Sequence, residues 1–150
     1  MTVTEIPYKR SRFSTRLLEN RLYTAGHSWL EDQGGEIWKI GFTKFAVRML
    51  GDIVELGFET DAGTDIETGQ VIGWIEGFKA VTDIFSPLSG QFDGFNPVLD
   101  KQIQLLTSDP YDKGWLFKIR GNPGDDCLDV HNYAALLDTT IDKMLGRRHE

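Results

Sequence analysis

Through most of the chain, apolar residues either alternate with polar ones or gather in short runs, and glycine recurs where these runs end. A period of two is typical of strands with one buried face, and short apolar runs bounded by glycine are typical of buried strands. The pattern therefore predicts short strands joined by turns. The predicted strands are Ser28–Leu30, Glu36–Phe42, Ile53–Phe58, Val71–Glu76, Asp83–Ser86, Gly90–Phe95 and Trp115–Ile119.

Three segments show the spacing of a helix instead. A short helix is predicted for Thr43–Leu50, with Thr43 as a cap and Gly51 closing its end. A second short helical stretch is predicted to open at Asn96-Pro97 and to run to about Leu106. The longest helix is predicted for residues 129–146, with Asp129 as its N-cap and an apolar stripe along one side. The stripe consists of Tyr133, Leu136, Leu137, Ile141, Met144 and Leu145.

An antiparallel β core with short helices and a C-terminal helix docked against it defines a mainly β or α+β fold. The 150 residues, with 40% hydrophobic and 26% charged, are typical of one globular domain, and we assign residues 1–150 to it. Residues 1–21 form a basic N-terminal segment within that domain. The chain has no apolar run near the roughly 18 residues that a membrane helix needs and no secretory signal, so a cytoplasmic protein that does not bind membranes is expected.

The charge distribution narrows the possible partners. A net charge of −7 argues against nucleic-acid binding, which depends on cations meeting phosphates. The acidic residues are concentrated between Arg48 and Lys79, where no basic residue occurs. This block is either a solvated surface or a surface that attracts a basic partner, so an acidic docking module is one hypothesis for the chain.

Catalytic and metal-binding motifs are poorly represented. The chain lacks a nucleophile elbow, a zinc-protease motif and the glycine fingerprints of nucleotide sites. We interpret His27, which lies beside Trp29, as a packed structural side chain, and Cys127, which has acidic neighbours, as an inert thiol. The single cysteine allows no internal disulfide, and no Cys/His group has the spacing of a zinc site. An enzyme using His27 and nearby carboxylates is the weakest hypothesis.

Lys79 is the residue that the pattern singles out. Two apolar strand-like runs flank Gly77-Phe78-Lys79-Ala80, which places Lys79 at or near the tip of a hairpin. An exposed lysine often serves only to keep a turn soluble. However, Lys79 is the one cation between Met49 and Leu99, and its neighbour Phe78 is aromatic where a turn normally has a polar residue. An accessible amine of this kind is suited to acylation, which would turn it into a tether for a group carrier such as lipoamide.

These residues resemble the H protein of the glycine cleavage system, a lipoyl carrier whose core reads E-S-V-K-A followed by S-D-x-Y-S-P-x-S-G. The matching segments are Glu76–Ala80 and Thr82–Gly90. Glu76 lies three residues before Lys79, Gly90 eleven after it and Gly63 sixteen before it, as in the family. The resemblance covers about residues 22–145 and includes further matches at Tyr23-Thr24, His27, Trp29, Gly41–Thr43, Leu50–Val54, Asn96, Leu99 and Ser108–Ile119.

The resemblance implies a barrel-sandwich hybrid, that is, a flattened sandwich of antiparallel sheets, with lipoate bound covalently to Lys79. It implies a recognition surface of Glu76, Gly77, Phe78, Ala80, Gly63 and Gly90 around that lysine, and no catalytic residue of the chain's own. The implied partners are lipoate ligase or other lipoylation enzymes, the enzymes that load the arm, and dihydrolipoamide dehydrogenase.

Two features differ from the usual family pattern. Gly77-Phe78 replaces Ser-Val before the lysine, and the segment before Tyr23 is long and basic. Both resemble the related lipoate-binding proteins that serve heterodisulfide-reductase-like complexes in sulfur oxidation, and the sequence leans to that branch. The alternatives are a glycine cleavage H protein that carries the aminomethyl group and a docking module that is not lipoylated.

Overall fold

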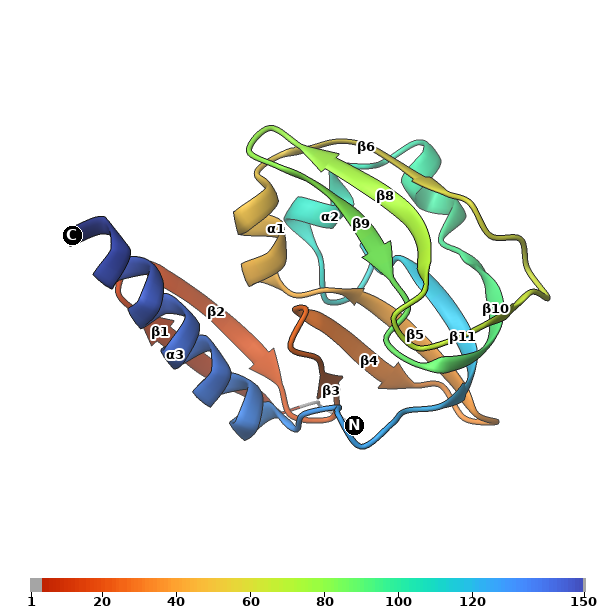
Figure 1. Cartoon of the computed structure of the whole chain (residues 1–150), viewed down its shortest axis with the longest axis horizontal. Coiled ribbons are helices and arrows are strands. Elements are labelled where there is room, and N and C mark those ends of the chain that lie inside the picture. The colour runs from red at the N-terminus through yellow and green to blue at the C-terminus, as the bar shows by residue number, and fades with distance from the viewer. Residues whose placement is uncertain (1–3, 150) are drawn as a thin grey trace.

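The computed structural model describes residues 4–149, with side chains up to Gly146. The larger part of the described chain is a flattened sandwich (Figure 1). One layer is a six-stranded sheet in the order β3 (Leu22–Tyr23), β4 (Ser28–Asp32), β5 (Ile37–Phe42), β11 (Phe117–Asn122), β10 (Ser89–Phe95) and β7 (Asp65–Ile66). The other layer is a three-stranded sheet in the order β6 (Ile53–Phe58), β8 (Val71–Gly77) and β9 (Val81–Phe85). The strand pairs are antiparallel, which confirms the predicted mainly β sandwich.

The main hydrophobic core lies between the two sheets. The three-stranded sheet contributes Ile72, Ile75 and Ile84, and the six-stranded sheet contributes Ile40 and Ile119, all almost completely buried. Because strand side chains alternate between faces, the opposite face of the three-stranded sheet is more exposed and carries Glu55, Glu76 and Asp83.

Short helices close the edges of the sandwich. Helix α1 (Lys44–Leu50) matches its prediction: Thr43 accepts a hydrogen bond from the Ala46 amide, and Gly51 ends the helix with φ of 79°. The predicted stretch from Asn96 to Leu106 is instead divided into η1 (Pro97–Asp100) and α2 (Leu105–Ser108). The amides of Lys101, Leu105 and Leu106 bond three residues back, and this tighter helical pattern sustains only short runs.

The N-terminal segment, to which the sequence pattern assigned no strand, forms a hairpin of β1 (Glu5–Arg10) and β2 (Phe13–Leu18). The hairpin packs on helix α3 (Val130–His149) at one end of the sandwich (Figure 1). Phe13 and Leu17 point inward from β2 and meet Tyr133, Leu137 and Ile141 of α3. The hairpin is therefore the partner that covers the apolar stripe of the C-terminal helix.

Polar contacts reinforce this packing. Tyr8 donates a hydrogen bond to Asp138 at 2.8 Å, and Arg10 pairs with Asp142 at 2.6 Å. Asp129 caps α3 as predicted, because its carboxylate accepts the Asn132 amide hydrogen bond at 2.8 Å. The helix extends three residues beyond its predicted end at residue 146.

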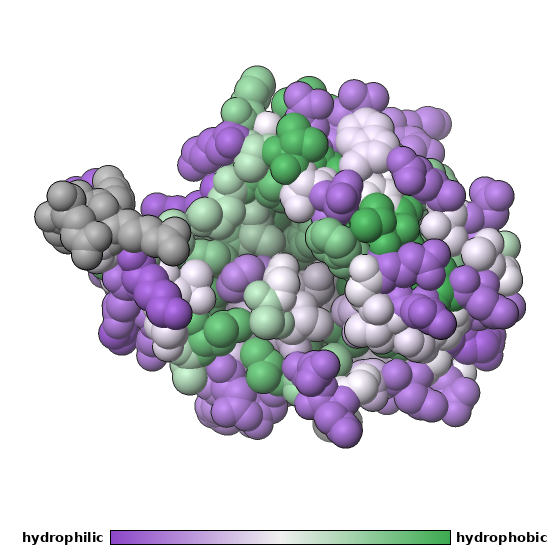
Figure 2. All heavy atoms as spheres, in the orientation of Figure 1, coloured by the Kyte–Doolittle hydropathy of each residue, from purple (hydrophilic) through white to green (hydrophobic). Residues whose placement is uncertain are grey.

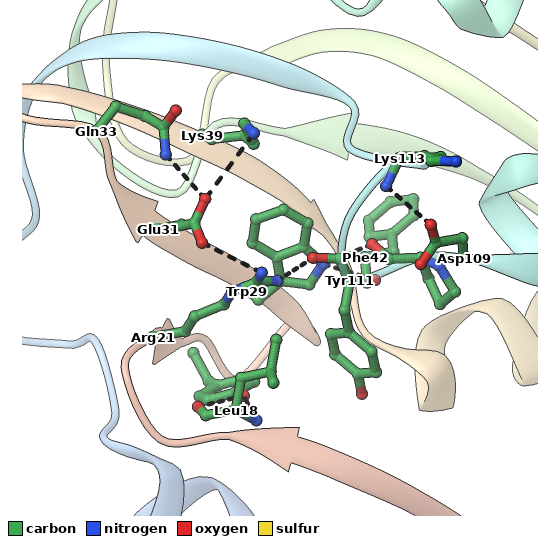
Figure 3. A network of polar contacts seen from close by, with 12 residues as sticks. Leu18, Arg21, Trp29, Glu31, Gln33, Lys39, Phe42, Asp109, Tyr111 and Lys113 are labelled. Carbon is green, nitrogen blue, oxygen red and sulfur yellow. Dashed lines mark hydrogen bonds and ion pairs between the residues drawn. The ribbon is translucent and has the colours of Figure 1, made fainter. Parts of the chain in front are cut away.

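Arg21 joins the hairpin to the sandwich through a buried network (Figure 3). Its guanidinium lies 4.2 Å from the centroid of the Trp29 ring, pairs with Glu31 at 3.2 Å and donates to the Tyr111 carbonyl. Burial lowers the pKa of Arg21, and the neighbouring Glu31 opposes that shift. The Trp29 indole in turn donates to the carbonyls of Phe42 and Pro110 at 3.1 and 2.9 Å. These bonds connect β4 to the end of β5, where α1 begins, and to the segment around Pro110.

Several predicted strands are displaced at their ends. Glu36 has φ of 66°, a left-handed conformation that a strand does not contain, so β5 begins at Ile37. The strand predicted for Trp115–Ile119 runs from Phe117 to Asn122, because Asn122 pairs with Ser89 across the sheet. The two-residue strands β3 and β7 were not predicted. Among the described helices, none is long and apolar enough to cross a membrane.

The sandwich core leads to a stability prediction for Ile75→Ala. Ile75 is 1% exposed, so truncation removes buried contacts and leaves a cavity, and the free energy of unfolding should fall by about 2–5 kcal/mol. Val81→Ala on the neighbouring strand is the control: Val81 is 67% exposed, and the loss should stay within about 0.5 kcal/mol. Urea unfolding measures both. Equal losses would contradict the assignment of the two faces of this sheet.

Candidate functional site

The hairpin formed by β8 and β9 presents Lys79 to solvent. The two strands pair up to Glu76 and Val81, and the Gly77 amide donates to the Ala80 carbonyl at 2.9 Å to close the turn. Phe78, Lys79 and Ala80 are exposed in that turn, where the sequence predicted the lysine. The turn protrudes at the edge of the sandwich, next to α1 (Figure 1).

The loop between α1 and β6 holds the backbone of this turn. The Lys79 amide donates to the Leu50 carbonyl at 2.8 Å, and the Phe78 amide donates to the Asp52 carbonyl at 3.0 Å. The Lys79 ammonium lies 3.4 Å from the Arg48 carbonyl, a long contact for a hydrogen bond. The base of the lysine is therefore fixed, while its amine remains accessible.

Two glycines allow this close approach. A Cβ at Gly77 would lie 2.1 Å from the Leu50 carbonyl oxygen, closer than any side chain tolerates. Gly51, with φ of 79°, would place a Cβ 3.0 Å from Cγ of Lys79. Glycine in place of the serine usual in the resembled family thus permits tight contact between the turn and the α1–β6 loop.

Apolar side chains surround the lysine at the surface. Phe78 is 80% exposed, and Met49, Val54 and Val81 are exposed as well. Figure 2 shows hydrophobic residues at the protruding turn and over the neighbouring α1. A patch of exposed apolar residues at a protruding turn is typical of a contact surface.

Carboxylates border this patch. Glu76 lies directly opposite Glu55 in the β6–β8 pair, although like charges at such positions are destabilising. Asp52 lies in the loop below the turn and is exposed. Glu76, Gly77, Phe78 and Ala80 adjoin Lys79 in the turn and at the ends of its strands, and their role in recognition stays a prediction.

Gly63 and Gly90 are positioned elsewhere. Gly63 has φ of 92°, and its amide donates to the Phe92 carbonyl. Gly90 lies in β10, opposite Gly121 and Ile66, where a Cβ would be 2.1 Å from the Arg120 carbonyl oxygen. Gly90 belongs to the six-stranded sheet and allows close backbone packing there, whereas Gly63 lies in the loop beside the sheet, where a Cβ would meet no atom within 4 Å and the positive φ is what favours glycine.

A pocket of about 490 Å³ opens between α1, β9 and the segment before α3. Its lining includes Met49, Thr82 and Asp83 together with His27, Asp126 and Cys127. Burial and the nearby Asp126 raise the pKa of the Cys127 thiol, in keeping with an inert thiol. Sequence patterns did not reveal this pocket because its walls come from four separate segments.

His27 connects the pocket to the helix core. Its Nδ1 lies 2.9 Å from the Tyr133 hydroxyl, which is also 2.8 Å from the Thr43 hydroxyl. Burial lowers the pKa of His27 to about 4, so the ring is neutral at neutral pH. These contacts support the interpretation of His27 as a packed structural residue.

The flattened sandwich with an exposed lysine on a hairpin turn agrees with the class of fold that the sequence resemblance implied. The family model described as Glycine cleavage H-protein matches residues 21–139, and the chain belongs to this family. Members of the family carry lipoate covalently on a lysine. The N-terminal hairpin lies outside the matched residues.

Individual relatives agree with this family. The glycine cleavage system H protein of Beutenbergia cavernae is 37% identical over 117 residues, which is 78% of this chain and 93% of that protein. The one from Bacteroides fragilis is 36% identical over 123 residues, 80% of this chain and 96% of that protein. The crystal structure of the H protein from Mycobacterium marinum superimposes with a TM-score of 0.71 at 28% identity and covers 79% of this chain and 97% of that one.

The buried His27 leads to a prediction about pH. The unfolded chain takes up a proton on this ring near pH 6.5, whereas the folded protein does so only near pH 4. The unfolded state therefore binds more protons between these values, and stability falls as the pH decreases through this window. The His27→Asn variant should lack this dependence of stability on pH. Asparagine is chosen because it tolerates the φ of 67° found at this position. Denaturant unfolding of both proteins from pH 7 to 4 measures the difference, and parallel curves would contradict a neutral buried His27.

Proposed function

We propose that Lys79 carries the lipoyl group and that the chain acts as a lipoyl carrier between partner enzymes. The observation that supports this is the geometry of the β8–β9 turn, in which an accessible amine stands on a backbone fixed by the Leu50 and Asp52 carbonyls. A swinging arm needs a mobile end and a fixed base, and this turn provides both.

The residues at the turn suit such an attachment. Acylation of the Lys79 amine removes its charge and exchanges only the long contact to the Arg48 carbonyl. The dithiolane of a bound lipoyl group would accept a group or electrons through its sulfur atoms. The chain itself would contribute the position of the arm, and the apolar patch with its carboxylate border would contribute recognition, so we propose a carrier rather than a catalyst.

We further propose that the carrier serves glycine cleavage, with lipoylation enzymes, the glycine cleavage enzymes and dihydrolipoamide dehydrogenase as partners. The names of the relatives support this choice over the sulfur-oxidation branch to which the sequence leaned. Gly77-Phe78 favours a heterodisulfide-reductase-like complex as a second candidate partner, since it alters both the bulk and the backbone beside the arm.

The attachment site can be tested by peptide mass spectrometry after co-expression with a lipoylation pathway. One lipoyl group is expected on Lys79 and none on Lys101, Lys113 or Lys118, because the enzyme must reach an amine presented on a protruding turn. Lys79→Arg should remain unmodified, whereas Lys101→Arg, at another exposed lysine, should be modified normally. Lipoylation elsewhere with Lys79 free would refute the proposal.

The partner can be tested by loading the lipoylated chain with a glycine decarboxylase or with a heterodisulfide-reductase-like complex. A glycine cleavage carrier should be loaded by the decarboxylase at least tenfold faster than by the other complex. The Lys79→Arg variant should not be loaded by either partner, because it has no lipoyl group to accept a load. If the chain were a docking module without lipoate, Lys79→Arg would bind its partner as well as the parent chain does. Phe78→Val, which restores the residue usual in the family, separates the effect of the aromatic ring from that of the arm. Loading by the second complex alone would reverse the choice of pathway.

A further inference from the structure

A second pocket opens between the tip of the β1–β2 hairpin, α1 and α3, and its volume is about 560 Å³. We call it the arginine groove, because the charged residues of its lining are Arg10, Arg12 and Arg48. The rest of the lining is mostly apolar and includes Phe13 from the hairpin and Met144 from α3. Among the described side chains, no carboxylate lines it. The groove is therefore basic and apolar in a chain with a net charge of −7.

Two of the three arginines have no partner of opposite charge among the described side chains. Arg10 is neutralised by Asp142 at 2.6 Å and by Asp138 at 3.4 Å. Arg12 and Arg48 are exposed, and neither pairs with a carboxylate in the part of the chain that the structure describes. Arg48 donates one hydrogen bond to the Arg12 carbonyl at 3.3 Å, which leaves most of the guanidinium donors of both residues available to a ligand.

The groove adjoins the surface around Lys79. Met49 lines the groove and is also 44% exposed in the apolar patch beside Lys79. Leu50, which follows it, accepts the Lys79 amide through its carbonyl and so holds the turn against the end of α1. A standard protein interface buries about 800 Å² of each partner. A protein that binds around Lys79 is therefore expected to cover the groove as well.

Charge differs in sign on the two sides of Lys79. Glu55 and Glu76 lie on β6 and β8, whereas Arg12 and Arg48 lie in the groove. Arginine binds carboxylates through paired donors, and an apolar lining gains free energy when apolar side chains replace the water on it. A segment in which carboxylates flank apolar side chains satisfies both requirements. A basic segment would be repelled by the arginines, and an acidic segment without apolar residues would leave the lining in water.

We propose that the arginine groove is a docking site for a segment of a partner enzyme in which acidic residues flank apolar ones. The inference rests on the proposed function only in its choice of partner, an enzyme that acts on the arm at Lys79, because binding of the segment itself requires no lipoyl group. Glu55 and Glu76 repel the same segment, so the groove sets the side of Lys79 on which it binds. The groove thus orients the enzyme relative to the arm and takes no part in the chemistry of the arm.

The first test titrates three helical peptides of about 12 residues into the full-length chain and follows binding by NMR. The first peptide carries leucines at helical spacing with glutamates between them, the second has lysine in place of each glutamate, and the third has serine in place of each leucine. The acidic leucine peptide should bind about tenfold more tightly than either of the others and should shift the resonances of Arg12, Arg48 and Met144. Equal affinity for the lysine peptide, or shifts that leave these three residues unaffected, would overturn the proposal.

Arginine variants test whether the groove is responsible. Arg12→Gln/Arg48→Gln should weaken binding of the acidic leucine peptide about tenfold. Arg16→Gln/Arg120→Gln removes the same charge from two exposed arginines outside the groove, so this matched control should bind as the parent does. Arg12→Glu/Arg48→Glu should reverse the preference, so that the lysine peptide binds more tightly. Equal weakening in the control, or a preference that the reversal leaves unchanged, would contradict a site at the groove.

The salt dependence of the parent chain needs no variant. Binding of the acidic leucine peptide should weaken severalfold as the salt concentration rises from about 50 to about 500 mM, because ions screen charge pairs that are open to solvent. An affinity that is independent of salt would contradict the pairing of the arginines with carboxylates.

Two other occupants of the groove are tested on the same chain. Dimerisation in analytical ultracentrifugation that is lost in Arg12→Gln/Arg48→Gln would overturn the proposal in favour of a second copy of the chain. Co-sedimentation with phosphatidylglycerol vesicles that the same variant abolishes would overturn it in favour of a membrane surface.

The choice of partner is tested with the enzyme that loads the lipoylated chain. The KM for the chain should rise about fivefold in Arg12→Gln/Arg48→Gln with kcat unchanged, because the two arginines hold the enzyme and do not touch the reacting group. The acidic leucine peptide should inhibit loading of the parent chain. An unchanged KM with both the loading enzyme and the lipoylation enzyme would overturn the assignment of the partner. Failure of the proposed function is recognised separately, because the intact mass would then lack the lipoyl group while the peptide measurements still decide whether the groove is a docking site.

Discussion

The contact of the Gly77 backbone with the carbonyl group of Leu50 is the constraint on which the position of Lys79 depends. A hairpin turn by itself is among the least restrained parts of a β protein, since few buried contacts limit its motion. Here a carbonyl at the end of α1 approaches so closely that a Cβ would lie 2.1 Å from it, and the next two amides bond to Leu50 and Asp52. The lysine thereby has a fixed base, and only its side chain is free to move.

This constraint depends in turn on α1. The Thr43 hydroxyl caps the helix and lies 2.8 Å from the Tyr133 hydroxyl. The Tyr133 hydroxyl in turn lies 2.9 Å from Nδ1 of His27. The position of the turn is therefore linked through α1 to the C-terminal helix, and the helix is linked to the hairpin by Arg10 and Tyr8. Elements far from Lys79 in the sequence therefore help to determine the position of its backbone.

Sequence analysis correctly predicted the structural features that depend on residues close together in the chain. The β8–β9 hairpin, the Thr43 and Asp129 caps and the exposed Lys79 follow from alternation, from capping residues and from glycine positions within a few residues of each other. The β1–β2 hairpin escaped prediction because its apolar face is covered by α3, and the contacts of Tyr8 and Arg10 with Asp138 and Asp142 span about 130 residues. The pockets were beyond sequence analysis for the same reason, since each is built from segments that only the fold brings together.

Charge divides the surroundings of Lys79 in a way that family membership alone does not determine. The family match begins at residue 21 and ends at residue 139, so the hairpin tip with Arg12 lies outside it, as do Ile141, Met144 and Leu145 of α3, which line the neighbouring pocket. The pocket with His27 and Asp83 is instead built from matched residues. Arg12 lies outside the matched residues and Arg48 lies within them, so the basic side of α1 combines a residue of the matched region with one of the N-terminal hairpin.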